Sequence, residues 1–260
     1  MKQSKTFRII LTALLVVFTH YAHGQMTQYV IGDAGNELAT RVRYMPSDGS
    51  SIIAGYKYDI VGGAGTNCQA IVMKVTSAGT IAWQKTFGVP ARNNIIMDMI
   101  ITQDNNIVVV GTVGGTGAVY ADNTAAILKF NSTDGTLMWQ KCLRDVVTTT
   151  GGELFFGVTE LTDGTGRLVA VGAHNYTGPG ADGMICVFQG ATGTLIYNDV
   201  YEIASGDEFE SVVTSADGAS VYMCGEFVGD YKDGRVISYT PGTTTGHINW
   251  SQYFDFYEFG

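Results

Sequence analysis

The sequence predicts an all-β fold of the β-propeller type, built from four-stranded antiparallel blades. The first observation is composition: 34 Gly, only 4 Pro and 45% hydrophobic residues are typical of many short strands joined by tight turns. The second is a repeated phrase, GTIAWQK at 79–85 and GTLMWQK at 135–141. The third is that no segment keeps a 3.6-residue apolar period over the length of a helix.

The N-terminal segment, residues 1–24, is interpreted as a secretory signal peptide. Lys2, Lys5 and Arg8 precede an uncharged apolar run at 9–19, and Ala22-His23-Gly24 forms a small-x-small cleavage site. Eleven apolar residues rise only about 16 Å as a helix, which is half of a bilayer core. We therefore expect cleavage near Gly24 and a secreted, periplasmic or cell-surface location.

The rest of the chain, residues 25–260, is predicted to form the propeller from four repeats at approximately 37–93, 94–152, 153–207 and 208–260. Each repeat has four strand-sized segments in a constant order. The first segments lie at 37–44, 94–101, 153–161 and 208–214. The second segments end on glycine (SIIAG at 51–55, IVVVG at 107–111, LVAVG at 168–172, VYMCG at 221–225), and the third lie at 70–75, 125–130, 184–188 and 235–239. The fourth contain Trp83, Trp139, Tyr197 and Trp250.

The second segments distinguish among all-β folds. IVVV at 107–110 and LVAV at 168–171 do not alternate between apolar and polar residues, so both faces of these strands should be covered. Without helices, other sheets must cover them, as in stacked propeller blades. We expect Gly135 to occupy the tight turn before the fourth strand and Trp139 to pack between neighbouring blades.

These motifs resemble the secreted bacterial β-propeller repeats of the seven-bladed-propeller-like (SBBP) class. The resemblance rests on D-G-x-x-IVVVG, A-x-x-LKF and DG-T-L-x-WQK and covers residues 37–260. It implies an extracellular or surface location and no known catalysis. A weaker resemblance to quinoprotein propeller repeats rests on Thr192-Gly193, and on Asp134-Gly135 before Trp139. The calcium and quinone ligands of those enzymes have no counterparts here, so that resemblance implies only a fold.

The number of blades stays open at this point. Residues 28–31 match the end of a fourth strand, and residues 255–258 match the opening of another repeat. The chain is therefore either a four-bladed ring with a spare strand or a piece of a larger ring. We favour the larger ring.

The charge balance limits the partners. Without the three cations of the signal peptide, 12 Lys and Arg stand against 24 Asp and Glu, a net charge of about −12. Such a surface repels nucleic acid and anionic membranes, and no second apolar run is long enough to enter a membrane. Four cysteines, Cys68, Cys142, Cys186 and Cys224, show no close pairing, and we expect buried free thiols.

Binding residues are expected on the long connections between second and third strands, which differ in every repeat and share one face of a propeller. The candidates are aromatic and histidine side chains of these connections: Tyr56, Tyr58, Tyr120, His174, Tyr176, Phe227 and Tyr231. A second candidate group is the start of each first strand, Glu37, Asn94, Glu153 and Glu208, which could converge at the channel mouth. Converging carboxylates there could hold calcium. No other cofactor, metal or catalytic residue is predicted.

The expected function is that of a non-catalytic binding or structural module, secreted or on the cell surface, that takes a glycan or protein at the variable loop face. The alternative is a secreted propeller enzyme, a hydrolase or quinone-type dehydrogenase, with its site at the channel mouth.

Overall fold

A computed structural model describes residues 36–58, 68–115, 122–143, 152–176, 181–201, 206–228 and 232–254. The chain divides into two compact units, Met1–Ile31 and Gly32–Gly260, and every described residue belongs to the second. The predicted signal peptide lies outside the described residues. The described ranges contain strands and turns, and no helix in them is long and apolar enough to cross a membrane.

Four antiparallel four-stranded sheets make up the described part, each built from strands in sequence order. We call them blades 1 to 4. Blade 1 contains β1 (Asn36–Met45), β2 (Ser50–Tyr58), β3 (Gln69–Val75) and β4 (Ile81–Phe87). Blade 2 contains β5 (Asn93–Ile101), β6 (Ile107–Gly115), β7 (Thr124–Phe130) and β8 (Leu137–Leu143).

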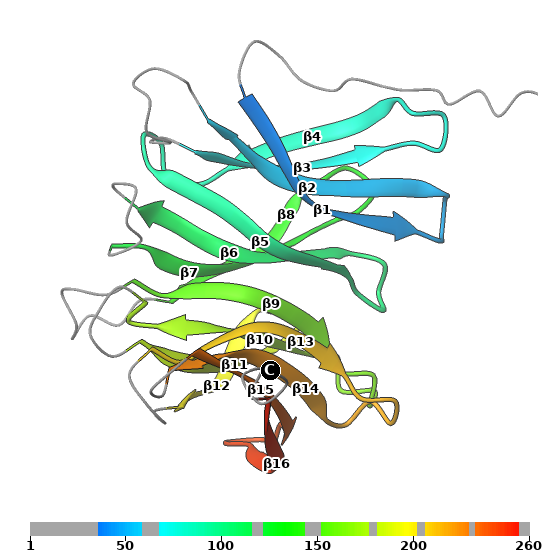
Figure 1. The fold of residues 1–260 in the computed structure, drawn as a ribbon. Coiled ribbons are helices and arrows are strands. Elements are labelled where there is room, and N and C mark those ends of the chain that lie inside the picture. The colour runs from blue at the N-terminus through cyan, green and yellow to red at the C-terminus, as the bar shows by residue number, and fades with distance from the viewer. Residues whose placement is uncertain are drawn as a thin grey trace, which may run out of the picture. The chain divides into compact units, whose positions relative to one another are not determined.

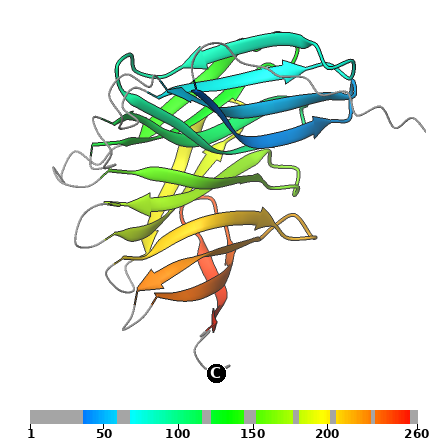
Figure 2. The ribbon, with the colours of Figure 1, turned by 45° about the horizontal axis from the view of Figure 1, so that its top comes forward.

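Blade 3 contains β9 (Leu154–Glu160), β10 (Arg167–His174), β11 (Asp182–Gln189) and β12 (Thr194–Tyr201). Blade 4 contains β13 (Glu208–Thr214), β14 (Val221–Val228), β15 (Lys232–Thr240) and β16 (His247–Phe254). The blades follow one another in chain order (Figures 1 and 2), and their first strands β1, β5, β9 and β13 are neighbours in that order. The all-β blade prediction is confirmed.

Three hydrophobic clusters form the core, one in each junction between consecutive blades. The first joins blades 1 and 2, the second joins blades 2 and 3, and the third joins blades 3 and 4. Along β6 the side chains of residues 107–110 all lie buried, as do residues 168–171 on β10. These strands are therefore covered on both faces, as their unbroken apolar sequence predicts.

The glycine that ends each second segment has a steric reason. A Cβ atom built on Gly111 would lie 2.0 Å from the backbone oxygen of Ile95 on β5, and the three equivalent glycines meet a first-strand oxygen at 1.8–1.9 Å. Only a residue without a side chain allows the inner two strands to approach so closely. These positions coincide with register shifts between the two strands.

The repeated tryptophan packs on the following blade. Gly135 has φ of 71°, and a Cβ atom there would lie 2.7 Å from the ring of Trp83. Gly193 stands in the same relation to Trp139, at 2.5 Å. The indole nitrogens of Trp83 and Trp139 donate to the backbone oxygens of Ser132 and Gly190. The predicted packing of this aromatic between blades is confirmed for these two positions.

A buried cation accompanies each of these contacts. Lys129 Nζ lies 2.7 Å from Asp104 Oδ2 in its own blade and donates to the Gly190 oxygen of blade 3 at 3.1 Å. Lys74 makes the same pair of contacts with Asp48 and with the Ser132 oxygen. We call this arrangement of turn aspartate, cation and next-blade carbonyl the inter-blade relay.

Blade 3 builds its relay from different residues. Arg167 pairs with Asp163 at 3.0 Å and donates to the Gly242 oxygen of blade 4 at 2.6 Å. The aromatic position is Tyr197, whose hydroxyl oxygen lies 3.2 Å from that of Tyr239 of blade 4. Tyr239 also hydrogen-bonds Asp199, which replaces the lysine of the WQK phrase. The fourth segment of this repeat has Tyr197-Asn198-Asp199 in place of WQK, and it keeps the contact with the next blade through these different side chains.

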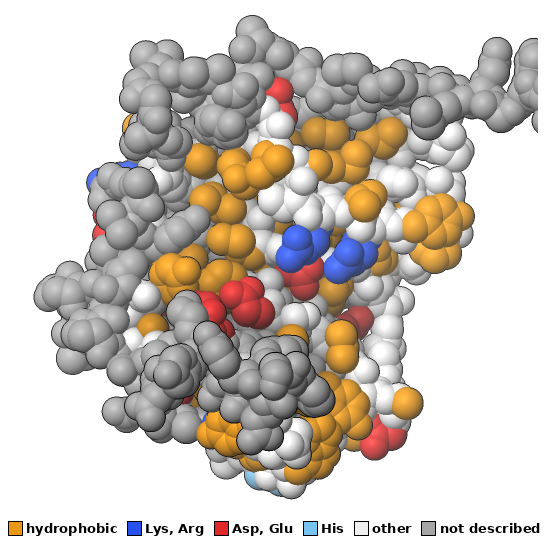
Figure 3. Space-filling view, viewed as in Figure 1, with side chains coloured by type: hydrophobic (Ala, Val, Ile, Leu, Met, Phe, Trp, Pro, Cys, Tyr) orange, Lys and Arg blue, Asp and Glu red, His pale blue; other side chains and the backbone are white. Residues whose placement is uncertain are grey.

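The inner strands have their own polar link. The Asp98 carboxylate of β5 accepts from Arg41 Nε and Arg43 Nη2 of blade 1, each at 3.2 Å. Its other oxygen accepts from the backbone nitrogen of Val158 in blade 3 at 3.2 Å. Acidic and basic side chains meet on this face of the molecule (Figure 3). One side chain therefore connects three blades.

The fourth copy of the aromatic behaves differently. Trp250 is 48% exposed, whereas Trp83 is 9% exposed, so the packing expected for Trp139 does not extend to Trp250 among the described residues. None of the three clusters joins blade 4 to blade 1. The thiols also differ in exposure: those of Cys68 and Cys186 are buried, whereas those of Cys142 and Cys224 are exposed. The expectation of uniform burial is corrected for these two.

Candidate functional site

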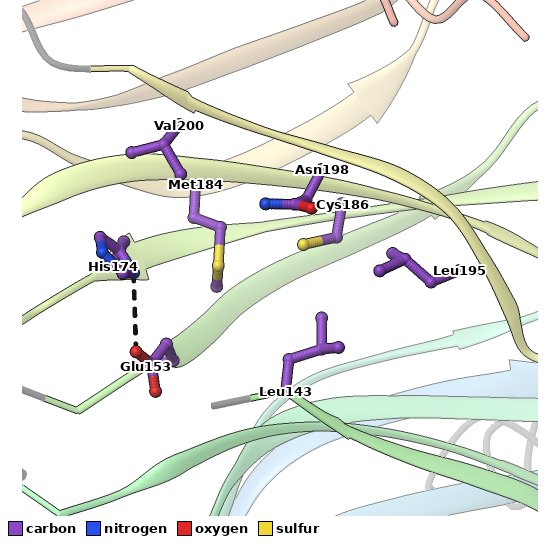
Figure 4. A pocket seen from close by; sticks show the side chains of 8 residues that line it. All are labelled: Leu143, Glu153, His174, Met184, Cys186, Leu195, Asn198 and Val200. Atoms are coloured by element: carbon purple, nitrogen blue, oxygen red, sulfur yellow. Dashed lines mark ion pairs between the residues drawn. The ribbon is translucent and has the colours of Figure 1, made fainter. Parts of the chain in front are cut away.

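A cavity of about 280 Å³ lies where the last residue of β8 approaches blade 3 (Figure 4). We call it the blade 2–3 pocket. Its lining combines apolar side chains, one thiol, one amide and one acid–imidazole pair: Leu143, Glu153, His174, Met184, Cys186, Leu195, Asn198 and Val200. Glu153 immediately precedes β9, and His174 ends β10. The polar end of the pocket therefore lies on the side of the variable connections.

Glu153 and His174 form the polar pair of this pocket. Glu153 Oε1 lies 3.5 Å from His174 Nδ1, and the two form an ion pair when the imidazole is protonated. The Glu153 side chain is 2% exposed and that of His174 is 18% exposed, so only the histidine edge faces solvent. The backbone nitrogen of Glu153 donates to the Asn123 oxygen of blade 2 at 3.2 Å, which fixes the carboxylate at the junction of the two blades.

The sulfur-containing side chains lie in the middle of the pocket. Figure 4 shows Met184 between the acid–imidazole pair and Cys186, with Leu143 and Leu195 farther along. Burial raises the pKa of the Cys186 thiol strongly, and the negative charge of Asp199 raises it further. The thiol therefore stays protonated at neutral pH and acts as a small apolar group rather than a nucleophile.

The predicted loop-face residues have different environments. His174 lines the pocket. Tyr176 follows closely: its ring lies 5.8 Å from that of Phe156, and its backbone nitrogen donates to the Gly152 oxygen. Tyr56 is partly buried on β2. The Tyr58 side chain, Tyr120 and Tyr231 lie outside the described residues.

The structure corrects the prediction that Phe227 lies on the variable loop face. It is 3% exposed and belongs to the core between blades 3 and 4, with its ring 5.7 Å from that of Phe209. Its side chain points into this core. β14 continues to Val228, so the residue lies inside a strand instead of in a connection. It is therefore not a surface for a loop-face ligand.

The predicted channel-mouth residues also differ from one another. Glu37 is exposed, Glu208 is partly buried, and Glu153 is buried beside His174. The Asn94 amide donates to the oxygens of Cys68, Val89 and Arg92, and its oxygen accepts from the backbone of Val89 and Gly114. Asn94 thereby fastens blade 1 to blade 2 and is a structural residue, not a cation ligand.

No group of three or more His, Cys, Asp or Glu side chains arranged to hold a metal ion is found among the residues that the structure describes. Glu37, Glu153 and Glu208 consequently form no such group. These three carboxylates therefore give no support to the calcium site considered from the sequence, and its test is given in the Discussion.

The strand order, the blade junctions and this pocket allow comparison with known proteins. No family model matches the sequence, and no curated protein matches it. Solved structures do match. The fold is a β-propeller. A hypothetical selenium-binding protein from Sulfolobus tokodaii superposes with a TM-score of 0.56 and 8% identity over 84% of this chain and 55% of its own.

A periplasmic gluconolactonase from Pseudomonas aeruginosa superposes with a TM-score of 0.53 and 12% identity, over 82% of this chain and 57% of its own. The chain thus spans just over half the length of each of these two proteins. At such low identity the similarity shows the fold and carries no residue roles.

Proposed function

We propose that this chain is a ligand-binding β-propeller of the cell exterior or periplasm, and that its site is the blade 2–3 pocket. The observation that carries the proposal is the buried Glu153–His174 pair at the loop end of a 280 Å³ cavity. An acid buried to this degree is costly unless the site uses its charge or its hydrogen bonds.

The lining points to a small neutral ligand with one polar edge. The cavity lies just below the range of about 300–1,000 Å³ that holds drug-sized molecules. Leu143, Met184 and Leu195 offer an apolar wall, while Glu153 and His174 offer an acceptor and an imidazole. A carboxylate inside an acidic protein disfavours anions. A sugar ring of monosaccharide size fits these properties, and a glycan is one of the two ligand classes, glycan or protein, expected from the sequence.

The proposed location at the cell exterior or in the periplasm rests on the sequence. Residues 1–24 have the charge and apolar pattern of a signal peptide, and the remaining chain is strongly acidic. Expression with the native N-terminus, followed by N-terminal sequencing of exported protein, should give Gln25 as the first residue. Recovery of uncleaved protein in the cytoplasm would contradict the proposal.

The binding test uses calorimetric titration with neutral probes: glucose, galactose, mannose and N-acetylglucosamine. We expect at least one to bind the parent protein, and we expect His174→Ala and Glu153→Gln each to weaken that binding more than about tenfold, because a buried polar partner is lost. His247→Ala and Glu37→Gln are matched controls on exposed residues and should bind as the parent does. Binding that survives both pocket variants would place the site elsewhere.

A second candidate function is hydrolysis at the same pair. A buried carboxylate beside an imidazole can accept a proton from water, and one structural relative is a gluconolactonase. Gluconolactone hydrolysis followed by acid release in a pH-stat tests this. Turnover that disappears in Glu153→Gln would favour the enzyme, whereas sugar binding without turnover would favour the binding module.

A further inference from the structure

The lining positions of the blade 2–3 pocket recur in blade 4 with different side chains. His174 lies two residues after the glycine that ends the second segment of its repeat, and Phe227 holds that place in blade 4. On the third strands Met184 pairs with this glycine in blade 3, and Arg235 pairs with it in blade 4. Two more positions correspond through the pairing of the fourth strands: Val200 with Tyr253, and Asn198 with Ser251.

The corresponding side chains of blade 4 face blade 3. Phe227 and Ile237 belong to the core cluster between these two blades. Arg235 lies two residues before Ile237 on β15, so it points to the same face of the sheet. We call Phe227, Arg235, Ser251 and Tyr253 the blade 3–4 cluster. Where the blade 2–3 pocket has a methionine between its strands (Figure 4), this cluster has a cation.

The guanidinium of Arg235 is held in one orientation by its neighbours. Its Cζ atom lies 5.1 Å from the ring centroid of Phe227 and 4.3 Å from that of Tyr253. Because β15 lies between β14 and β16, the two rings flank the cation. Its Nε donates to the hydroxyl of Ser251. Cation–π attraction to two rings and one hydrogen bond therefore fix the group before any ligand arrives.

The charge of Arg235 is nevertheless left without an acidic partner. Its Nη1 atom is buried and has no hydrogen-bond partner among the described residues. The other described arginines each pair with an aspartate: Arg41, Arg43, Arg92 and Arg167. An N–H donor of a cation that is buried without an acceptor is costly. The arrangement therefore suits an acceptor that comes from outside the chain.

We propose that the blade 3–4 cluster is a second ligand site, which binds a sugar acid through its carboxylate. A planar guanidinium forms two parallel hydrogen bonds with a carboxylate. Tyr253 is 50% exposed, and its ring offers an aromatic surface to the apolar side of a sugar ring. A hexuronic acid has both features. Phe227, at 3% exposed, supports the guanidinium from the core and does not touch the ligand.

This site differs in charge from the blade 2–3 pocket. The pocket carries the buried Glu153 carboxylate, which disfavours anions, whereas the blade 3–4 cluster carries a cation. Neighbouring junctions would therefore select a neutral and an acidic ligand. The argument uses the position of the pocket in the repeat and not the ligand proposed for it, so each site can be tested without the other.

The test is calorimetric titration at constant ionic strength with glucuronate, galacturonate, glucose and inorganic phosphate. We expect at least one uronate to bind the parent protein more tightly than either glucose or phosphate binds this site. Arg235→Gln should weaken uronate binding more than about tenfold, because the charge-assisted hydrogen bonds are lost. Arg92→Gln removes the same charge from another partly exposed arginine and should bind as the parent does.

Two further measurements separate recognition from damage to the fold. The methyl ester of the bound uronate keeps the ring but lacks the charge, and it should bind the unaltered parent more than about tenfold more weakly. Tyr253→Ala, at a half-exposed residue, should also weaken binding, whereas Tyr253→Phe should retain it. Glu153→Gln should leave uronate binding unchanged, which distinguishes this site from the blade 2–3 pocket.

Three results would overturn the proposal. The first is a parent protein that binds neither uronate at millimolar concentration. The second is uronate binding that survives in a folded Arg235→Gln variant or is unaffected by esterification. The third is tighter binding of inorganic phosphate than of either uronate, which would assign the cation to another class of anion. Loss of neutral-sugar binding in His174→Ala bears only on the blade 2–3 pocket.

Discussion

Trp83 is the residue that most directly joins two blades. Its ring covers Gly135 of blade 2, its indole donates to the Ser132 oxygen, and 9% of it is exposed. The same indole position at Trp139 meets Gly193 and the Gly190 oxygen. Because each ring fills space that a glycine leaves, neither partner can change alone without a cavity or a clash.

Replacing this ring should therefore be costly. We expect Trp83→Ala to lower the free energy of unfolding by about 3–5 kcal/mol, as for other large-to-small changes in a core. Urea denaturation measures it. Leu137→Ala, at a residue 43% exposed on the outer strand of blade 2, should change stability by less than about 0.5 kcal/mol. Similar losses in both variants would mean that the ring does not hold the junction.

Alanine substitutions at two glycines distinguish steric strain between strands from torsional strain of the backbone. A Cβ atom at Gly111 would lie 2.0 Å from a backbone oxygen, whereas Gly164 has φ of 81° and open space around it. Gly164→Ala should cost about 1–2 kcal/mol for the left-handed backbone alone. Gly111→Ala should cost more than that, because strands β5 and β6 must separate. Denaturant unfolding of both variants gives the order, and the reverse order would contradict this account.

At the residue scale, the sequence predicts packing better than it predicts the site. Trp139 and Gly135 are recognisable in the sequence because both recur at constant spacing. Met184, Cys186 and Asn198 carry no such signal, since they lie within strands and become pocket residues only when blade 2 approaches blade 3. Sequence reasoning places Phe227 in a connection, because no sequence feature shows that β14 extends past Gly225.

At the scale of elements, the inter-blade relays connect the turns at one end of the sheets. Burial raises the pKa of Asp104, but hydrogen bonds from Lys129, Thr102 and Asn106 outweigh it and lower the pKa to about 2. The hydrogen bond from Lys74 is the main cause of the similar pKa of about 2 at Asp48. Each charged aspartate is therefore favoured in the folded protein over the unfolded chain.

This lowering predicts loss of stability in acid. A carboxylate whose pKa is lowered on folding stabilises the fold fully above its unfolded pKa of about 3.9, and the contribution is lost as pH falls toward the folded value. We expect the free energy of unfolding to fall between about pH 4 and pH 2. Lys129→Met should make that fall shallower, because Asp104 loses its cation. Lys141→Met, at an exposed lysine of the same blade, should keep the slope of the parent; equal slopes in all three proteins would exclude the relay as the cause.

At the scale of the whole molecule, the four-phrase repeat predicts the four sheets and their strand order. It does not show which blades have neighbours on both sides. That difference becomes visible only in the exposure of Tyr222, Trp250 and Val42, because the local sequence of a blade changes little whether or not another blade covers it. The predicted channel-mouth residues differ from one another for a similar reason: Asn94 and Glu153 begin equivalent segments, yet Asn94 fastens blade 1 to blade 2 and Glu153 lines the pocket.

Melting experiments with calcium test whether the three predicted channel-mouth carboxylates bind a cation. Because Glu37, Glu153 and Glu208 form no metal-binding cluster in the described residues, we expect no rise in melting temperature with millimolar calcium. Thermal melts of the parent and Glu153→Gln, each with and without calcium, measure this. A rise in the parent that Glu153→Gln abolishes would show that the three carboxylates do bind a cation, by mass action on the folded state.

The relays and the pocket occupy opposite ends of the blades. Asp48, Asp104 and Asp163 lie in the turns between first and second strands, whereas His174 is the last residue of β10, next to the connection between second and third strands. Natural variation and laboratory loop grafting can therefore act on the connections that follow β2, β6, β10 and β14 without disturbing these joints. Exchange of the segment after His174 for one of another length should leave the unfolding midpoint nearly unchanged, while the same exchange at residues 102–106 should lower it. The turns that carry the inter-blade contacts are thus separate from the connections that border the pocket.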